Sequence, residues 1–363
     1  NPPVTMRLMR TDRRSLLKMG ALVIARALLP PLPSPDRYAD GLSDQSSIAR
    51  PLLGFARGLN WAGAIRSEPS LQAPQVSKLT RDNVLPIYAE VETESGTVHN
   101  KLWYEVKGGY VHSSNVHVVD WQLNQPETDA GETGFWAELT VPFFDVRAGP
   151  ALSAGRARYR YYGGTVYKVI KVVKSTDPAD AGLWYQIEDE MFAGLWFVPG
   201  KYMRRIPDDD FTPLSPEIDP AEKKLVVNLR EQRVYAYERE QEVFSCRAAT
   251  GAQFQTGDFS TPVGKWHIFR KTPTQHMYGG AVGDEGSFDL PGIPWVCYFT
   301  TSGVAFHGTY WHNDYGVPRS HGCVNVTSPN AKWIWRWSMP PNDPAERYIH
   351  IRKADLGTTV VVE

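Results

Sequence analysis

Short apolar segments that alternate with polar residues run through most of the chain. Alternation at a period of two predicts half-buried β-strands. The order of the aromatic segments suggests a weak internal repeat, in which three segments of a first copy have counterparts in a second. These are residues 85–88, 102–106 and 109–111, matched to 141–144, 183–187 and 195–198. We therefore expect two small strand-rich units, at residues 76–120 and 135–207.

These two repeats resemble the bacterial Src-homology-3-type barrel, so the resemblance predicts one or two small β-barrels. Residues 41–75, which precede them, are polar and compatible with a helix but have no strong pattern. Tryptophan and tyrosine side chains in the repeats could bind wall glycan or peptide if they are exposed. The other interpretation is that they fill the cores of the barrels, as such residues commonly do in small domains.

An acidic, proline-rich segment at residues 208–220 follows the repeats. Its composition is typical of a semi-extended connector between independent domains. After it, residues 224–229 and 233–237 are strand-like and flank Arg-Glu-Gln, which predicts a hairpin. Strand-like stretches continue to the carboxyl end, so we expect a strand-rich domain over residues 221–363.

One helix is predicted in this domain. It begins at Ser328-Pro329, with the serine placed to cap it and the proline in its first turn. Trp333 and Trp337 are four residues apart, so they share one face of the helix and are expected to be core residues. The predicted fold is therefore mostly β: a strand-rich carboxyl-terminal domain with one short helix, preceded by one or two small β-barrels.

Composition narrows the class of protein. The chain has 363 residues, 30 Gly and 28 Pro, which suits two or three domains of short strands joined by turns. The formal net charge of -1 gives no cationic excess, so nucleic acid is not an expected partner. No uninterrupted apolar run reaches about 18 residues, so no transmembrane helix is expected in the mature chain.

The amino terminus has the features of an export leader. Five basic residues between Arg7 and Lys18 include the pair Arg13-Arg14, and a modest apolar run follows at 19–29. We expect residues 1–40 to be an export signal, of the twin-arginine type, with Met6 as a plausible start. A disordered basic leader or a short interfacial helix is the alternative. Export predicts a location in the cell envelope, either the periplasm or the extracellular wall.

The chain has three cysteines, at 246, 297 and 323. Their spacing fits neither a disulfide framework nor a metal site. A Cys246–Cys297 bridge could form in an oxidising compartment, but a lone buried cysteine is ordinary in apolar strands. No metal and no cofactor are expected.

The segment that carries candidate chemistry reads His307-Gly308-Thr309 and, after a loop, Ser-His-Gly-Cys-Val-Asn at 320–325. A thiol of ordinary pKa is only a few per cent ionised at neutral pH, and a neighbouring imidazole can take its proton and later return it. We expect two strands joined in a hairpin to bring His307 and Cys323 together. Gly322 leaves the backbone N–H groups at 322 and 323 accessible to a developing oxyanion.

Together these positions resemble the L,D-transpeptidase catalytic domain, also called the YkuD-type domain. The turns Thr250-Gly251 and Thr261-Pro262-Val263-Gly264 match the same family, and the resemblance covers roughly residues 221–363. It implies that Cys323 attacks the carbonyl of the third residue of a peptidoglycan stem peptide and expels the terminal D-alanine. An amine of another stem then captures the thioester, which gives a 3-3 cross-link.

The resemblance also assigns roles around the nucleophile. It makes His307 the general base and acid, oriented by a backbone carbonyl that we expect to be that of Gly308. It places His321 near the thiolate as an electrostatic or orienting group. Ser320 and Asn325 either brace the loop or contact the substrate.

Three further residues are candidates for binding the stem peptide. Arg319 could meet a carboxylate of the peptide and Trp311 could cover it, or the two could be a solvated charge and a packed aromatic. Gly279-Gly280 favour a flexible segment, and the resemblance implies that Tyr278, beside them, belongs to a lid over the site.

Other functions remain open on the sequence alone. Water could resolve the thioester, which would make the protein an L,D-carboxypeptidase, and an amine on an anchored protein is another acceptor. A wall-binding module with an idle catalytic domain is the alternative of a different class. A metal hydrolase is disfavoured because no His-x-x-x-His spacing is present.

Overall fold

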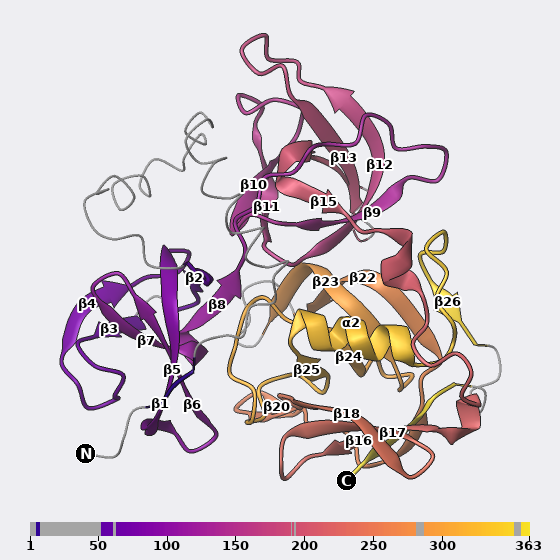
Figure 1. Cartoon of the computed structure of the whole chain (residues 1–363). Helices are drawn as coiled ribbons and strands as arrows, with labels where there is room; N and C mark the ends of the chain where they lie inside the picture. Colours follow the sequence, from indigo (N-terminus) through magenta and orange to yellow (C-terminus); the bar gives the residue numbers. More distant parts are fainter. Residues whose placement is uncertain are drawn as a thin grey trace. The chain divides into compact units, whose positions relative to one another are not determined.

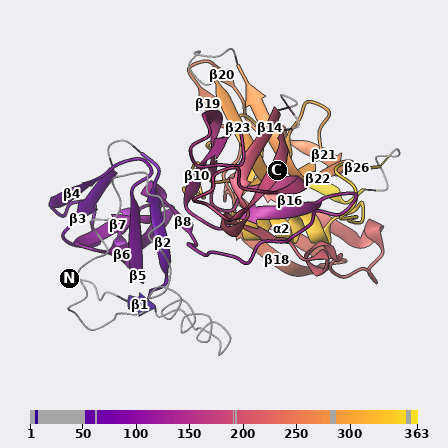
Figure 2. The same cartoon turned by 90° about the horizontal axis from the view of Figure 1, so that it is seen from above.

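The computed structural model describes residues 5–7, 52–60, 63–189, 191, 194–280, 287–351 and 357–363. The chain forms two compact units, Asn1–Val119 and Asp120–Glu363, which are coloured along the sequence in Figure 1 and seen from above in Figure 2. Except for residues 5–7, the expected export leader lies outside the described residues.

The first unit is an eight-stranded sheet with the order β4-β3-β7-β6-β5-β2-β8, and β1 also pairs with β5. Its strands are β1 (Thr5–Arg7), β2 (Gly54–Gly58), β3 (Gly63–Arg66), β4 (Gln75–Leu79), β5 (Val84–Thr97), β6 (Asn100–Val106), β7 (Gly109–His112) and β8 (Val116–Val119). The expectation that residues 41–75 are helix-compatible and separate from this unit is wrong, because β2 and β3 are strands of the sheet. β2 has no clear apolar pattern because it contains Arg57. This arginine is buried, and its guanidinium pairs with the Asp82 carboxylate at 2.8 Å.

The second unit opens with a seven-stranded sheet of order β11-β10-β14-β13-β12-β9-β15, called the second sheet below. Its strands are β9 (Phe135–Leu139), β10 (Phe143–Arg147), β11 (Arg156–Tyr162), β12 (Val166–Lys174), β13 (Leu183–Asp189), β14 (Gly194–Pro199) and β15 (Met203–Arg205).

The two sheets repeat one topology. If the strands β2–β8 and β9–β15 are each renumbered from one to seven, both sheets have the order 3-2-6-5-4-1-7. Each also has a 3-10 turn before its last strand, at Ser113–Asn115 and Gly200–Tyr202. The internal repeat is therefore present in the structure, while the likeness to Src-homology-3 barrels stays a prediction.

Two of the three matched pairs of segments occupy equivalent strands. β6 corresponds to β13, and β7 to β14. The third pairing is wrong, because residues 85–88 lie in β5, whereas 141–144 lead into β10, which is equivalent to β3. Trp103 and Trp184 are fully buried in the equivalent strands β6 and β13, so these two aromatics are core residues rather than ligand-binding ones.

The rest of the second unit, residues 208–363, includes residues 221–363, for which the family resemblance predicts a catalytic domain; it is called the catalytic domain below. It contains two five-stranded sheets, of order β18-β17-β16-β27-β21 and β25-β24-β23-β22-β26, and the small pair β19-β20. The strands are β16 (Lys223–Asn228), β17 (Arg233–Glu238), β18 (Gln241–Arg247), β19 (Gln253–Phe254), β20 (Gly257–Asp258), β21 (Gly264–His267), β22 (Arg270–Gly279), β23 (Phe288–Tyr298), β24 (Ala305–Gly308), β25 (Val324–Val326), β26 (Ile349–His350) and β27 (Thr359–Val362). The predicted hairpin is confirmed, since β16 and β17 pair antiparallel.

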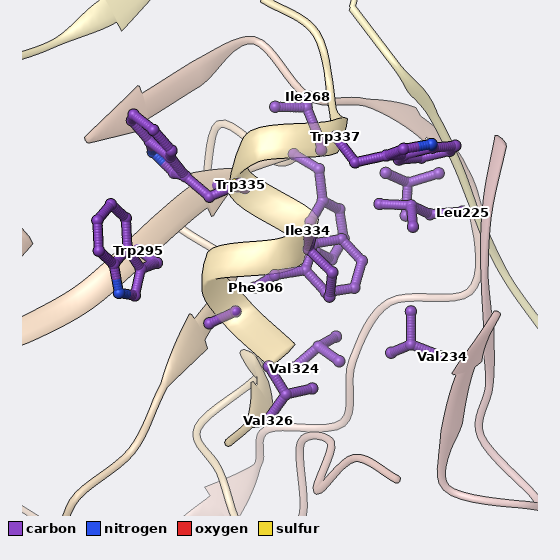
Figure 3. Packing of buried hydrophobic residues seen from close by; sticks show 14 of the residues in the cluster. Leu225, Val234, Ile268, Trp295, Phe306, Val324, Val326, Ile334, Trp335 and Trp337 are labelled. Carbon is purple, nitrogen blue, oxygen red and sulfur yellow. The ribbon is translucent and has the colours of Figure 1, made fainter. Parts of the chain in front are cut away.

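Helix α2 (Ser328–Trp337) lies between these two sheets (Figure 1). Its cap is Thr327, whose side chain accepts from the Asn330 N–H, so the expected cap at Ser328 is one residue too late. Trp333 and Trp337 stack 5.4 Å apart on one face, as predicted. Buried side chains of α2 and of both sheets meet in one apolar core, part of which Figure 3 shows.

Within residues 208–220, Phe211 and Leu214 pack on this core, so this part of the segment is not a free connector. Phe211, in the 3-10 turn Asp208–Phe211, is 2% exposed and contacts the rings of Trp295 and Trp335. Arg336 of α2 donates to the carbonyl of Thr212 at 2.8 Å. The acidic, proline-rich composition did not predict this packing, because the contacts are made by a single aromatic residue and by backbone carbonyls.

Candidate active site

Parallel strands bring the candidate nucleophile and base together. β24 and β25 pair in parallel, with Phe306 opposite Val324 and His307 opposite Asn325, and Cys323 directly precedes β25. The expected hairpin is therefore wrong. The residues between the strands, 309–323, are numerous enough for the crossover that a parallel pair needs.

His307 is buried and its ring is oriented by the backbone. Its Nδ1 lies 3.0 Å from the Gly308 carbonyl oxygen, the contact expected from the sequence. Because a carbonyl only accepts, Nδ1 carries the hydrogen and Nε2 keeps a free lone pair. Burial lowers the pKa of His307 to about 4, although the bond to Gly308 acts in the opposite direction. The imidazole is therefore neutral at pH 7 and can accept a proton.

The thiol of Cys323 is also neutral in this structure. Burial raises its pKa to about 11, while the backbone N–H of Ala305 acts in the opposite direction. Its Sγ lies 3.8 Å from the Gly303 carbonyl oxygen. A neutral thiol and a neutral imidazole from adjoining strands suit general-base activation, in which the thiolate forms only as the proton is transferred.

A strand-like stretch at residues 248–252 anchors the loop that precedes Cys323. Isolated bridges join Ala249 to Asn325 and Gly251 to Ser320. Thr261 Oγ1 donates to the Gly322 carbonyl at 2.7 Å and accepts from the Gly251 N–H at 2.8 Å. The two threonine-containing turns of the sequence therefore hold the nucleophile loop in place.

Gln232 supports the same stretch and was missed as a site residue. Its side chain accepts from the Thr250 N–H at 2.9 Å and donates to Thr250 Oγ1 at 2.8 Å. Nothing in the local pattern shows this role, since the two residues are eighteen positions apart.

The two glycines of the motif have steric roles. Gly322 has φ +112°, which a residue with a side chain rarely adopts. A Cβ on Gly308 would lie 2.8 Å from Pro294 Cγ and from Ser328 Oγ. The expectation that the Gly322 N–H is free for an oxyanion is not met, because it donates to Ser320 Oγ at 3.1 Å. Ser320 Oγ in turn donates to the Cys323 carbonyl, so Ser320 braces the loop.

His321 lies in a cluster of phenylalanine rings that was not predicted from the sequence. The ring stacks on Phe254 at 4.7 Å, meets Phe259 edge-on at 4.6 Å, and lies 5.3 Å from Phe288. Burial lowers its pKa. The apolar surroundings therefore favour a neutral ring at His321.

Asn325 and Arg319, two of the candidate substrate-binding residues, have partners within the protein. The Asn325 amide lies 3.0 Å from His312 Nε2, deep in the domain. The Arg319 guanidinium pairs with Asp314, with Nε at 2.9 Å, and its side chain is 48% exposed. Asn325 is thus a bracing residue, whereas Arg319 is held in place but reachable from solvent.

Trp311 and Tyr278 differ in their surroundings. The Trp311 ring lies 5.8 Å from the His307 imidazole. Tyr278, near the end of β22, is 61% exposed. His312, which contacts Asn325, was not predicted as a site residue; burial lowers its pKa to about 3.

The other cysteines are not bridged: Cys246 and Cys297 are buried free thiols. Burial raises their pKa values to about 12 and about 11. Within the described part of the chain, no helix is both long and apolar enough to cross a membrane.

A thiol and a neutral imidazole on adjoining parallel strands are the pair that cysteine acyl-transfer enzymes use. Residues 222–362 match the family model of the L,D-transpeptidase catalytic domain, YkuD. The family acts on peptidoglycan stem peptides. The match does not extend to the two repeated sheets.

The chain is 25% identical over 130 residues to YciB of Bacillus subtilis, which carries the name of an L,D-transpeptidase; the match spans 33% of this chain and 63% of that protein. Among solved structures it is similar to the L,D-transpeptidase from Mycobacterium smegmatis, at 18% identity and a TM-score of 0.32, over 52% of this chain and 80% of the other. It is also similar to a mutant of an Enterococcus faecium L,D-transpeptidase, at 18% identity and a TM-score of 0.30, over 39% of this chain and 50% of the other.

Proposed function

We propose that this protein is a peptidoglycan L,D-transpeptidase of the cell envelope, with Cys323 as nucleophile and His307 as general base and acid. The observation that carries the proposal is the pairing of β24 with β25, together with the bond between His307 Nδ1 and the Gly308 carbonyl. This arrangement leaves Nε2 as the free proton acceptor of the imidazole.

In the proposed first step, the Cys323 proton passes to His307 Nε2 and the sulfur attacks the carbonyl carbon of the third stem residue. The tetrahedral intermediate carries its negative charge on the former carbonyl oxygen, which the Cys323 N–H would stabilise. The C–N bond to the terminal D-alanine then breaks, and His307 returns the proton to the leaving amine. The product is a thioester on Cys323.

In the second step, an amine of a neighbouring stem attacks the thioester. His307 takes a proton from the amine, the C–S bond breaks, and the thiol is restored when His307 gives the proton back. The product is a 3-3 cross-link. If water attacks instead, the same residues release a free carboxylate, which is the carboxypeptidase reaction.

The remaining site residues have proposed roles that follow from their contacts. Arg319, half exposed and oriented by Asp314, would bind a carboxylate of the stem peptide. Trp311 and Tyr278 would cover the peptide. His321 would limit access of water to the thiol, because phenylalanine rings surround it.

Intact-protein mass spectrometry of the full chain with a carbapenem tests the proposal. We expect one covalent adduct on the wild type, none on Cys323→Ala, and slow formation on His307→Ala. Cys246→Ala is the matched control, because this buried thiol of high pKa should not react. A folded wild type without an adduct, and without one from a tetrapeptide stem, would favour the wall-binding module.

A further inference from the structure

The second sheet and the catalytic domain share an interface that resembles a domain core. β11 contacts β23, and β12 contacts both β22 and β23. Thr274 Oγ1 donates to the Val166 carbonyl at 2.5 Å, and Trp136 Nε1 donates to the Pro344 carbonyl at 2.8 Å. Trp136 and Val166 are buried in the same apolar cluster as the core of the catalytic domain. Such packing differs from the polar contacts typical of freely moving domains.

A tyrosine ring of the second sheet packs directly against the backbone of the catalytic domain at this interface. The ring of Tyr167, from β12, lies against Gly292 of β23, where an added Cβ would be 2.4 Å from Tyr167 Oη. Nearby, His276 of β22 contacts Asp189 of the second sheet and Asp289 of β23 at 3.1 and 2.6 Å. The second sheet therefore meets the β22–β23 hairpin through interlocking contacts.

At the active-site end of the interface lies Tyr162, the last residue of β11. Its ring stacks on Tyr310, with centroids 5.2 Å apart, and Tyr310 is fixed by a hydrogen bond from its hydroxyl to the Pro291 carbonyl at 3.0 Å. Tyr310 meets Trp311 edge-on at 5.1 Å, and Trp311 lies 5.8 Å from the His307 imidazole. A continuous row of rings thus links the second sheet to the candidate base.

Tyr162 also packs on the apolar cluster beside the nucleophile. The cluster consists of Ile293, Val296, Tyr298, Ala305 and Tyr310, and the half-buried side chains of Tyr162, Trp311 and Cys323 all pack against it. Protein interiors are packed as densely as organic crystals, so a void on one side of such a cluster displaces its other members. A change at Tyr162 would therefore reach both Trp311 and Cys323.

We propose that the second sheet is a structural part of the active site, and that Tyr162 is a positioning residue that holds Trp311 and, through it, the His307 imidazole. This inference rests on the proposed function, because it assumes that Cys323 is the acylated residue. It implies that the catalytic domain alone is incomplete, although residues 222–362 span the family match.

The test compares Tyr162→Ala, Tyr162→Leu and Phe144→Ala in the full chain. Phe144 is the matched control: it is another half-buried aromatic of the second sheet, but its ring contacts Trp184 of that sheet and Tyr202 of the 3-10 turn before β15. The measurement is the rate of Cys323 acylation by a carbapenem as a function of pH, with the melting temperature of each variant.

We expect both Tyr162 variants to acylate about tenfold more slowly or worse, since small displacements of catalytic groups cost large factors in rate. We also expect the acidic limb of the pH profile to move to higher pH, because a looser cluster hydrates His307 and raises its pKa toward the ordinary value. Phe144→Ala should keep the wild-type rate and profile. Tyr162→Leu keeps apolar bulk, so it provides the comparison if the alanine variant does not fold.

Wild-type rates and profiles in the folded Tyr162 variants would overturn the inference. So would an equal slowing in Phe144→Ala at an equal loss of melting temperature. A wild type that is not acylated at Cys323 would instead overturn the proposed function, so the two failures can be told apart.

Discussion

His276 should make the stability of the second unit depend on pH. Its Nδ1 lies 3.1 Å from Asp189 Oδ2 and its Nε2 lies 2.6 Å from Asp289 Oδ1. Carboxylates only accept, so both ring nitrogens carry hydrogen and the ring is an imidazolium. Burial alone would lower the pKa of His276, but the hydrogen bonds and charges of the two carboxylates outweigh it and raise the pKa.

The perturbation is His276→Gln, which removes the charge and keeps one amide donor. Removing one partner of a buried ion pair costs about 3–5 kcal/mol, because the remaining buried charge loses its counter-charge. The Asp189 side chain is 3% exposed, whereas that of Asp289 is 31% exposed and keeps the Arg158 guanidinium at 2.9 Å. The substitution therefore destabilises mainly the Asp189 carboxylate, and we expect the free energy of unfolding to fall by about 3 kcal/mol at pH 6.

The sign of the pH dependence follows from the raised pKa. The stabilisation by His276 is fully present below the unfolded pKa of about 6.5 and is lost as the pH rises through the folded value. Lys271 acts with the opposite sign, since burial lowers its pKa to about 7. The quantity to follow is therefore the difference between wild type and variant, in which the Lys271 contribution cancels. This difference should shrink from pH 6 to pH 9.

Urea unfolding followed by circular dichroism at several pH values measures this difference. Arg158→Gln is the control: its side chain is 56% exposed, so its ion pair should contribute less than about 1 kcal/mol and no pH dependence in this range. The imidazolium assignment is wrong if His276→Gln costs less than about 1 kcal/mol at pH 6, or costs the same at pH 6 and pH 9.

Three other substitutions have expected outcomes. Gly308→Ala places a Cβ 2.8 Å from Pro294 Cγ. It should lower the unfolding free energy by about 1–3 kcal/mol in a urea titration. It should also slow acylation, followed by mass spectrometry, about a hundredfold. Phe211→Ala removes a ring that is 2% exposed and should cost about 3–5 kcal/mol in urea unfolding; a negligible loss would restore the free-connector interpretation. Thr261→Val leaves the Gly322 carbonyl without its donor and should cost about 1–3 kcal/mol, with slower acylation of a folded protein; an unchanged rate would contradict its anchoring role.

The strand-rich fold could be predicted because its signals are local. Alternation marks β6, β13, β16 and β17, and Pro329 marks the start of α2. Strand order is not a local property, so the shared topology of the two sheets was visible only as a loose repeat. β2 was missed because a buried arginine interrupts its apolar pattern, and its partner Asp82 is 25 residues away.

The chemistry of the site could be predicted from the motif, but its supports could not. His307 and Cys323 are recognisable as residue types, and the Gly308 carbonyl is adjacent in sequence. The supports come from distant segments: Thr261 bonds across 61 positions, and Tyr162 stacks on Tyr310 from the preceding sheet. The choice between a hairpin and a parallel pair also depends on long-range pairing, so the expected hairpin was the wrong connection.

The proposed mechanism requires that the Cys323 thiol attacks a stem peptide with His307 as base. The decisive experiment is to incubate the full chain with a tetrapeptide stem and follow both the protein and the peptide by mass spectrometry. We expect release of D-alanine, a thioester on Cys323 and a cross-linked dimer, all absent from Cys323→Ala. Release of D-alanine that persists in a folded Cys323→Ala variant would contradict the mechanism, as would no release by the folded wild type.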